Sequence, residues 1–185
     1  MIICIDPGHS GSAEPGAVHE LYTEAKLALT IACYVKDHLT KFGHKVLMTR
    51  QGEIDSDLLE PRVALANSAN ADLFASIHIN AAMNTIASGF EIYHYPASSK
   101  GKLLAEFVQR SMLNIIYLPD RGVKSSDFYV LGQTAMPAVL IECGFLSNSY
   151  DRQFMISPTG QYMLGEAIAC GLNYYWRRYG AKKEA

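Results

Sequence analysis

The sequence predicts an α/β fold in which a twisted, mostly parallel sheet of about six strands is flanked by helices on both faces. Three observations support this class. Short apolar runs of strand length alternate with longer segments whose apolar residues recur at helical spacing. Hydrophobic residues make up 49% of the chain, which is enough to bury a core. The 185 residues contain no repeat or linker, so we expect a single domain over 1–180 and a frayed polar tail over 181–185.

The first elements along the chain are a strand and a long helix. The apolar run IICID at 2–6 predicts a buried strand. Residues 7–22 contain glycine and proline and are expected to form a loop. Apolar residues then recur every three or four positions over 24–42, which predicts an amphipathic helix that Gly43 terminates.

A second strand, a turn, a helix and a third strand follow. The segment HKVLMTR at 44–50 predicts a strand, and the polar residues 51–57 predict a turn. A helix is expected to begin near Pro61, because proline suits the first helical turn, and to end near Asn70. The segment ADLFASIHIN at 71–80 is mostly apolar and predicts a buried strand.

The remaining elements repeat this alternation. The segment FEIYHY at 90–95 predicts a strand, and the apolar spacing over 99–117 predicts a helix. Two further strands are expected, FYVL at 128–131 and PAVLIECGF at 137–145. The last long helix is expected over about 160–178.

The charge pattern excludes several classes of partner. The chain has 16 basic and 18 acidic residues and a formal net charge of −2. Nucleic-acid binding and polybasic membrane binding both need clustered lysine and arginine. No apolar run approaches the roughly 20 residues that span a bilayer. We therefore expect neither nucleic acid nor a membrane as a partner.

The four cysteines indicate the compartment of folding. None of them forms a CxxC pair, and all lie inside apolar segments, so we expect buried free thiols and a reducing compartment. They are Cys4, Cys33, Cys143 and Cys170.

Polar side chains lie at the ends of three of the predicted strands. Asp6 and His9 follow the first strand, His78 and Asn80 end the third, and Glu142 ends the last. In open parallel sheets, ligand sites lie outside the carboxyl ends of the strands. Imidazole and carboxylate groups are suitable zinc ligands, and catalytic zinc sites use three protein ligands with one open position. The pattern is compatible with a zinc site, but spacing alone is a weak signal, because a histidine at a strand end is more often a structural hydrogen-bonding group.

Three glutamates are candidates for the remaining roles. Either Glu20 or Glu24 fits as a third ligand, and Glu24 also fits simple placement at a helix N-terminus. Glu142 interrupts the apolar run AVLI-E-CGF, where an ionised group is costly unless it is paired or used, so it is a candidate general base. The alternative for Glu142 is a structural ion pair with Arg50, Arg62 or Lys124.

Sequence motifs along nearly the whole chain carry a family resemblance. The chain resembles the zinc-dependent N-acetylmuramoyl-L-alanine amidases, which cleave peptidoglycan. The order and separation of DPGH, SIHxNA and PAVLxExGFLSN are the most specific part of this resemblance. The matching segments are IDPGHSG (5–11), PGA (15–17), EAKLAL (24–29), TR (49–50), RVALAN (62–67), ADLFASIHINA (71–81), SGFEIYHY (88–95), RGVK (121–124), FYVL (128–131) and MPAVLIECGFLSN (136–148).

The resemblance implies roles for named residues. Position by position, it places the family's ligands for one Zn²⁺ ion on His9, Glu24 and His78. It places the family's catalytic glutamate on Glu142.

Three further residues have two interpretations each. Asn80 fits either an additional hydrogen-bond donor at the site or a turn residue that ends a strand. Asp6 fits either a hydrogen-bond acceptor that orients His9 or a cap of the loop. Arg121 is expected in a loop that faces the anionic stem peptide, or as ordinary surface charge.

The implied reaction is zinc-dependent hydrolysis of the amide bond between the lactoyl group of N-acetylmuramic acid and L-alanine of the stem peptide, with a glutamate as general acid and base. Two alternatives remain: a zinc peptidase that cuts within the stem peptide, and a non-catalytic wall-binding module on the same fold. The expected partner is peptidoglycan, and a monomer is favoured. No signal peptide is evident, so an enzyme of the endolysin or autolysin type is expected to be released through a lysis pore or trimmed from a longer chain.

Overall fold

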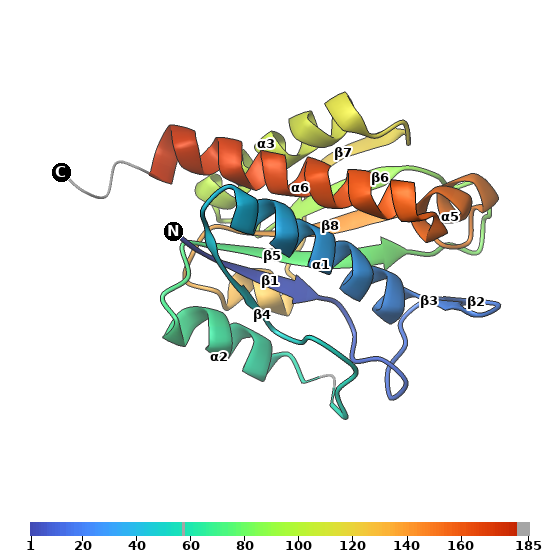
Figure 1. Ribbon diagram of the computed structural model, residues 1–185, viewed down its shortest axis with the longest axis horizontal. Helices are drawn as coiled ribbons and strands as arrows, with labels where there is room; N and C mark the ends of the chain where they lie inside the picture. The colour runs from blue at the N-terminus through green and yellow to red at the C-terminus, as the bar shows by residue number, and fades with distance from the viewer. Residues whose placement is uncertain (57, 181–185) are drawn as a thin grey trace.

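A six-stranded sheet forms the centre of the protein, whose computed structural model describes residues 1–56 and 58–180 (Figure 1). All neighbouring strands are parallel except β6 and β8, which pair antiparallel. The prediction of a mostly parallel sheet of about six strands is therefore confirmed. In spatial order the strands are β4 (Lys45–Met48), β1 (Ile2–Pro7), β5 (Leu73–Asn80), β8 (Ala138–Phe145), β6 (Phe90–His94) and β7 (Asp120–Ser125).

Helices cover both faces of this sheet. Three long helices, α1 (Glu24–Lys41), α3 (Ser99–Ile115) and α6 (Pro158–Tyr179), enclose the larger hydrophobic core on one face (Figure 1). On the other face, α2 (Glu60–Ser68) and α4 (Tyr129–Gly132) bury a smaller cluster. The polar residues near the strand ends point to this second face, which carries the smaller layer.

The alternation of side chains along the strands explains this division. In β5, Leu73, Ala75 and Ile77 point into the larger core, whereas Phe74 belongs to the smaller cluster. Successive side chains of a strand point to opposite faces, so His78 lies on the same face as Phe74. A strand that reads as mostly apolar therefore still presents Ser76, His78 and Asn80 to the face that carries the site.

Four features of the fold differ from the sequence-based prediction. The segment expected as a strand at 128–131 is the short helix α4, because a four-residue apolar run is too short for its periodicity to distinguish the two. No strand was expected at β7, whose sequence DRGVKS is polar, as is common for a strand at the edge of a sheet. The helix α5 (Ser149–Ile156) and the small hairpin of β2 (Val18–His19) and β3 (Tyr22–Thr23) were also not expected.

The cysteines are all free, as predicted, but the prediction of burial is confirmed for only two of the four. Cys4 and Cys143 are buried, Cys170 is partly buried and Cys33 is exposed. Cys33 lies on the same face of α1 as the exposed residues Asp37 and Thr40, which points away from the core. An apolar stretch of helix has positions on both faces, so its composition alone does not establish burial.

Two other expectations concern the C-terminal tail and membrane-spanning helices. The tail expected over 181–185 lies outside the described residues. Within 1–56 and 58–180, no helix is both long enough and apolar enough to cross a membrane.

Candidate metal centre and active site

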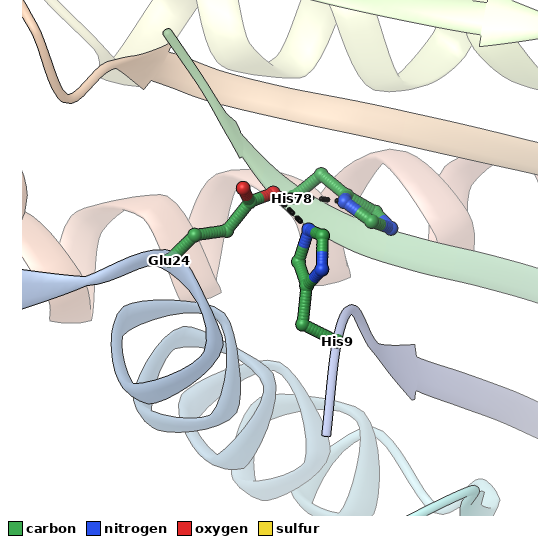
Figure 2. Close-up of side chains that lie close together, drawn as sticks. All are labelled: His9, Glu24 and His78. Carbon is green, nitrogen blue, oxygen red and sulfur yellow. Dashed lines mark hydrogen bonds and ion pairs between the residues drawn. The ribbon is translucent and has the colours of Figure 1, made fainter. Parts of the chain in front are cut away.

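Two histidines and a glutamate from distant parts of the chain meet at the carboxyl end of the sheet (Figure 2). One ligand atom from each of His9, Glu24 and His78 lies within 4.8 Å of the other two. Oε1 of Glu24 is 3.0 Å from Nε2 of His9 and 2.9 Å from Nδ1 of His78. Two imidazole nitrogens and one carboxylate oxygen are a donor set that suits catalytic zinc, so the residues present fit the metal that the sequence predicts.

Local structure explains why these side chains converge. His9 follows β1 with φ of 60°, a left-handed conformation that turns the chain sharply after the strand. Glu24 is the first residue of α1, and the side chain of Thr23 caps this helix by accepting a hydrogen bond from the backbone of Lys26. His78 lies in β5, which pairs directly with β1. A loop, a helix start and a strand thus each contribute one side chain to the cluster.

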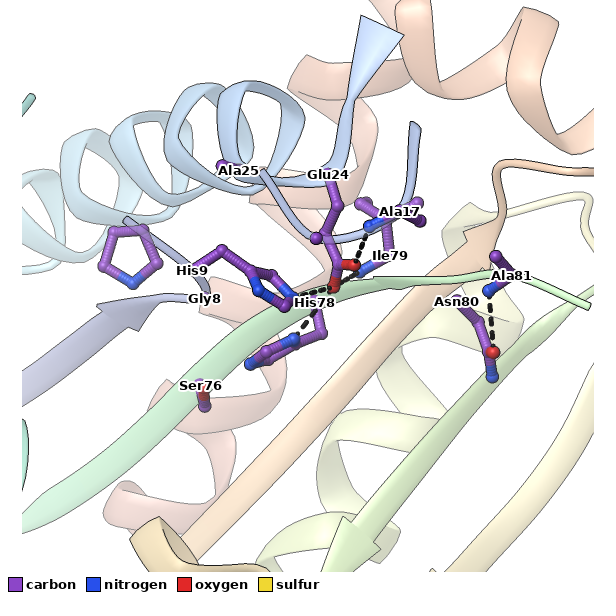
Figure 3. Close-up of polar contacts among 12 residues, drawn as sticks. Gly8, His9, Ala17, Glu24, Ala25, Ser76, His78, Ile79, Asn80 and Ala81 are labelled. Atoms are coloured by element: carbon purple, nitrogen blue, oxygen red, sulfur yellow. Dashed lines mark hydrogen bonds and ion pairs between the residues drawn. The ribbon is translucent and has the colours of Figure 1, made fainter. Parts of the chain in front are cut away.

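Backbone groups hold the carboxylate of Glu24 in place. Oε2 accepts a hydrogen bond of 2.9 Å from the N–H of Ala17, and Oε1 accepts one of 2.9 Å from the N–H of Ile79 (Figure 3). Glu24 itself is only 6% exposed. A buried carboxylate fixed by two backbone donors has little freedom, so its position does not depend on the histidines alone.

The competing ligand candidate, Glu20, lies elsewhere. It occupies the turn between β2 and β3 with φ of 54°, and its side chain is exposed. The cluster that the structure brings together contains Glu24 and does not include Glu20.

Strong electrostatic coupling accompanies this geometry. Burial alone would raise the pKa of Glu24, but hydrogen bonds and charge interactions with His78 and His9 hold it far below its usual range. Burial opposes protonation of His9, but Glu24 and Glu14 raise its pKa to about 9. Burial likewise opposes protonation of His78, whose pKa is nevertheless raised by its hydrogen bond to Glu24 and by nearby Glu142. The site therefore concentrates negative charge where a cation would bind.

Glu142 lies beside the cluster on the neighbouring strand. It is the register partner of His78 in the pairing of β5 with β8, so both side chains point to the same face. Its Oε2 atom is buried and has no hydrogen-bond partner among residues 1–56 and 58–180. Burial raises the pKa of Glu142 to about 7, with Glu24 and Glu91 adding to the increase and the two histidines opposing it. A carboxyl with this pKa suits proton transfer near neutral pH.

The cations considered as partners of Glu142 make other contacts. Arg50 donates to the carbonyl oxygens of Pro7, Gly8, Ala25 and Gly52. Arg62 forms an ion pair with Asp6, and Lys124 forms one with Glu91.

Comparison with known proteins identifies the family. The family model for N-acetylmuramoyl-L-alanine amidases matches residues 3–174. The chain belongs to this amidase family. The amidase LytC of Bacillus subtilis (strain 168) is 36% identical over 178 residues, which cover 95% of this chain but 35% of LytC. The protein YqiI of the same organism is 36% identical over 176 residues, which cover 94% of this chain and 84% of YqiI.

A solved amidase structure has the same fold. The N-acetylmuramoyl-L-alanine amidase from Clostridium difficile 630 superimposes with a TM-score of 0.91 at 34% identity, covering 97% of this chain and 98% of the other. The predictions of a peptidoglycan amidase, of a hydrolase and of a single α/β domain are therefore confirmed.

Glu14 is a residue of the amidase site that the sequence analysis missed. Its Oε2 atom forms a short contact with Nδ1 of His9. A histidine that ligates a metal commonly hydrogen-bonds a carboxylate through its other ring nitrogen, which fixes the ring orientation. Here that contact leaves Nε2 of His9 facing Glu24. Glu14 lies within an irregular loop, where no periodic pattern marks it, so the sequence offered no signal for it.

Asp6 does not orient His9, and this expectation is corrected. Its Oδ1 atom accepts hydrogen bonds from Oγ1 of Thr49 and Nη1 of Arg62, and its Oδ2 atom accepts one from Oγ of Ser76. Asp6 is 1% exposed, and a buried charge is tolerated only when it is paired in this way. It therefore anchors the chain just before the ligand loop.

Asn80 and Arg121 contact Glu91. The amide nitrogen of Asn80 donates to Oε1 of Glu91. Its oxygen accepts from the N–H of Ala81, as a turn residue at a strand end would (Figure 3). Arg121 was expected in a loop, but it lies in β7 and forms an ion pair with Glu91.

A cavity of about 820 Å³ lies away from these residues. Leu73 and Pro137, at the amino ends of β5 and β8, line it together with Tyr95 and Trp176. It is at the opposite end of the strands from His78 and is not part of the candidate site.

Proposed function

We propose that this amidase is zinc-dependent, that His9, Glu24 and His78 hold one zinc ion, and that Glu142 is its general acid and base. The observation that carries the proposal is the convergence of three ligand atoms within 4.8 Å, with Glu142 in register beside His78. Zinc bound by such ligands acts as a Lewis acid on an amide carbonyl and makes water a nucleophile at neutral pH.

The protein residues supply the proton transfers and the positioning. The carboxylate of Glu142 accepts the proton of the attacking water and then delivers a proton to the departing amine of L-alanine. Its buried Oε2 atom has no partner within the described structure, so it is available as this acceptor. Glu14 orients His9, and the N–H groups of Ala17 and Ile79 orient Glu24. The ligands are thus fixed by contacts within the protein.

The proposed substrate is the bond between the lactoyl group of N-acetylmuramic acid and L-alanine, in peptidoglycan outside the cytoplasm. The names of the matched relatives favour this bond over one inside the stem peptide. A monomer is proposed as the working form. Residues 1–180 are proposed as the zinc amidase catalytic domain.

Product analysis tests the bond, the metal and the activity together. Purified peptidoglycan is digested, and mass spectrometry measures new N-terminal alanine in the presence and absence of a chelator. We expect new N-terminal alanine, loss of this product with the chelator, and its recovery when Zn²⁺ is added. Cleavage within the stem peptide would replace the amidase with a peptidase, and new reducing sugar ends alone would indicate a glycosidase. The exposed variant Arg110→Gln, on α3 and outside the site, is digested in parallel as a control and should give the same products as the unmodified enzyme.

A further inference from the structure

A row of ionisable side chains crosses the sheet from the metal cluster toward its edge. Glu142 of β8 is the register partner of His78 in β5 and also of Glu91 in β6. Directly paired residues on adjacent strands point to the same face, so these three side chains form one continuous row. The row continues to Arg121 and Lys124 of β7, which both form ion pairs with Glu91.

Glu91 is a buried anchor for the two cations at the end of this row. It is 3% exposed, and its Oε2 atom contacts both Nε of Arg121 and Nζ of Lys124. Its Oε1 atom accepts hydrogen bonds of 2.8 Å from both Asn80 and the hydroxyl of Tyr93. One carboxylate thus faces two cations, so Glu91, Arg121 and Lys124 together carry a net positive charge beside Glu142.

Arg121 is held in place while part of its guanidinium stays available. Its side chain is 37% exposed, and the guanidinium carbon lies 4.9 Å from the ring centroid of Phe145, a cation–π contact. Nη1 makes only a long hydrogen bond of 3.5 Å to the carbonyl of Ser88, and Nη2 has no partner within the described residues. The planar guanidinium is therefore oriented, and donors that suit a carboxylate face solvent.

We propose that Arg121 and Lys124 form a subsite that binds a carboxylate of the stem peptide, on the leaving-amine side of the scissile bond. This inference rests on the proposed function. The side of the bond follows from Glu142, because the group that protonates the amine of L-alanine must lie next to the peptide. The row from Glu142 through Glu91 then continues beneath the peptide.

The spacing of the strands agrees with this assignment. Adjacent strands lie about 4.8 Å apart, so β7 is about 10 Å from β8, and Arg121 and Lys124 extend back from β7 toward Glu91 on the strand between. An extended peptide advances about 3.5 Å per residue. The span from the scissile nitrogen of L-alanine to a carboxylate at the far end of the next residue covers two residue lengths, or about 7 Å. That distance places the carboxylate between Glu142 and β7.

The test uses two muramoyl-peptide substrates that differ only at the residue after L-alanine, where one carries a free carboxylate and the other a carboxamide. We expect the unmodified enzyme to prefer the free carboxylate, mainly through a lower KM. In Arg121→Gln, kcat/KM for the carboxylate substrate is expected to fall by about 10- to 100-fold, the range for losing a hydrogen bond between charged groups. The carboxamide substrate should change by less than about threefold on the same reasoning, because it lacks the charge.

Lys124→Gln provides a second variant should Arg121→Gln fail to fold, and the same loss of preference is expected from it. Arg110→Gln, which removes an exposed arginine from α3, should leave the preference unchanged. Equal cleavage of both substrates by the unmodified enzyme would overturn the subsite while leaving the proposed amidase activity intact. An equal fall for both substrates in the variants would also overturn it, because that pattern indicates a purely structural role. Failure to release L-alanyl peptide from either substrate would overturn the proposed function and the subsite together.

Discussion

Replacing Arg62 by methionine is expected to destabilise the protein strongly and to loosen the ligand loop. Nη1 of Arg62 lies 2.8 Å from Oδ1 of Asp6, and the two residues are 4% and 1% exposed. The same guanidinium donates to the carbonyl oxygens of Pro7 and His9, at 2.8 and 2.6 Å. Removing one partner of a buried ion pair costs about 3–5 kcal/mol, because the other charge stays buried without compensation.

The size of this effect gives a clear assay. For a domain of this length each kcal/mol lowers Tm by about 2–4 °C, so Arg62→Met is expected to lose about 6–20 °C. Urea and thermal unfolding are measured at neutral pH with a chelator present, because a metal bound only by the folded state would add its own stabilisation. The exposed Arg110→Met is the matched control and should stay within about 0.5 kcal/mol of the unmodified protein.

A second variant separates charge burial from simple loss of packing. Asp6→Asn combined with Arg62→Met removes both charges and keeps an oxygen that can accept from Thr49. The double variant should therefore be more stable than Arg62→Met alone. The reasoning is refuted by a loss below about 1 kcal/mol in Arg62→Met, well under the expected cost, or by a double variant that is no more stable than the single one.

Three further predictions concern the site. Glu142→Gln should lower kcat by about 10²- to 10⁴-fold while zinc content, measured by metal analysis, stays unchanged; full activity would exclude Glu142 as the general base. Glu14→Gln should weaken zinc affinity by about 10- to 100-fold in a chelator competition, because His9 loses its orienting partner, and unchanged affinity would contradict that role. Gly8→Ala should reduce zinc affinity by a similar factor, about 10- to 100-fold, because the added Cβ would lie 2.5 Å from Nε2 of His78 and displace the ring. The control is Gly52→Ala, where an added Cβ meets nothing within 4 Å, and this variant should bind zinc normally.

The parts of the fold that the sequence predicted are those that bury a continuous apolar pattern. β1, β5 and β8 have runs of buried residues, and α1 has apolar residues at helical spacing along its buried face. β7 was not predicted because its sequence DRGVKS has no apolar run. Edge strands commonly carry polar and charged residues, which discourage pairing with another chain. α4 was misassigned because its four residues include only two buried side chains, too few to distinguish a helical period from a strand period.

The residues of the candidate site were also predictable from the sequence only in part. His9 follows β1, His78 lies two residues before the end of β5, and Glu142 lies in the carboxyl-terminal half of β8. The parallel-sheet rule made these residues candidates, and the family resemblance then implied their roles. Glu14 was not predictable, because its contact with His9 depends on the path of an irregular loop that includes a left-handed residue. The choice between Glu24 and Glu20 likewise required the hairpin of β2 and β3, which turns Glu20 outward and places Glu24 at the start of α1.

The contacts that position His9, Glu24 and His78 come from the protein itself, and this has a consequence for the order of folding and of the proposed metal binding. Backbone N–H groups fix Glu24, Glu14 fixes His9, and the N–H of Gly8 donates to the carbonyl of Ile77, which joins the ligand loop to the strand that carries His78. The larger hydrophobic core lies on the opposite face of the sheet from His78 and Glu142. In small zinc domains the metal replaces a core, so folding requires it. Here the core and the ligand geometry have separate supports, and we therefore expect the domain to fold first and to bind zinc in a site that is already formed.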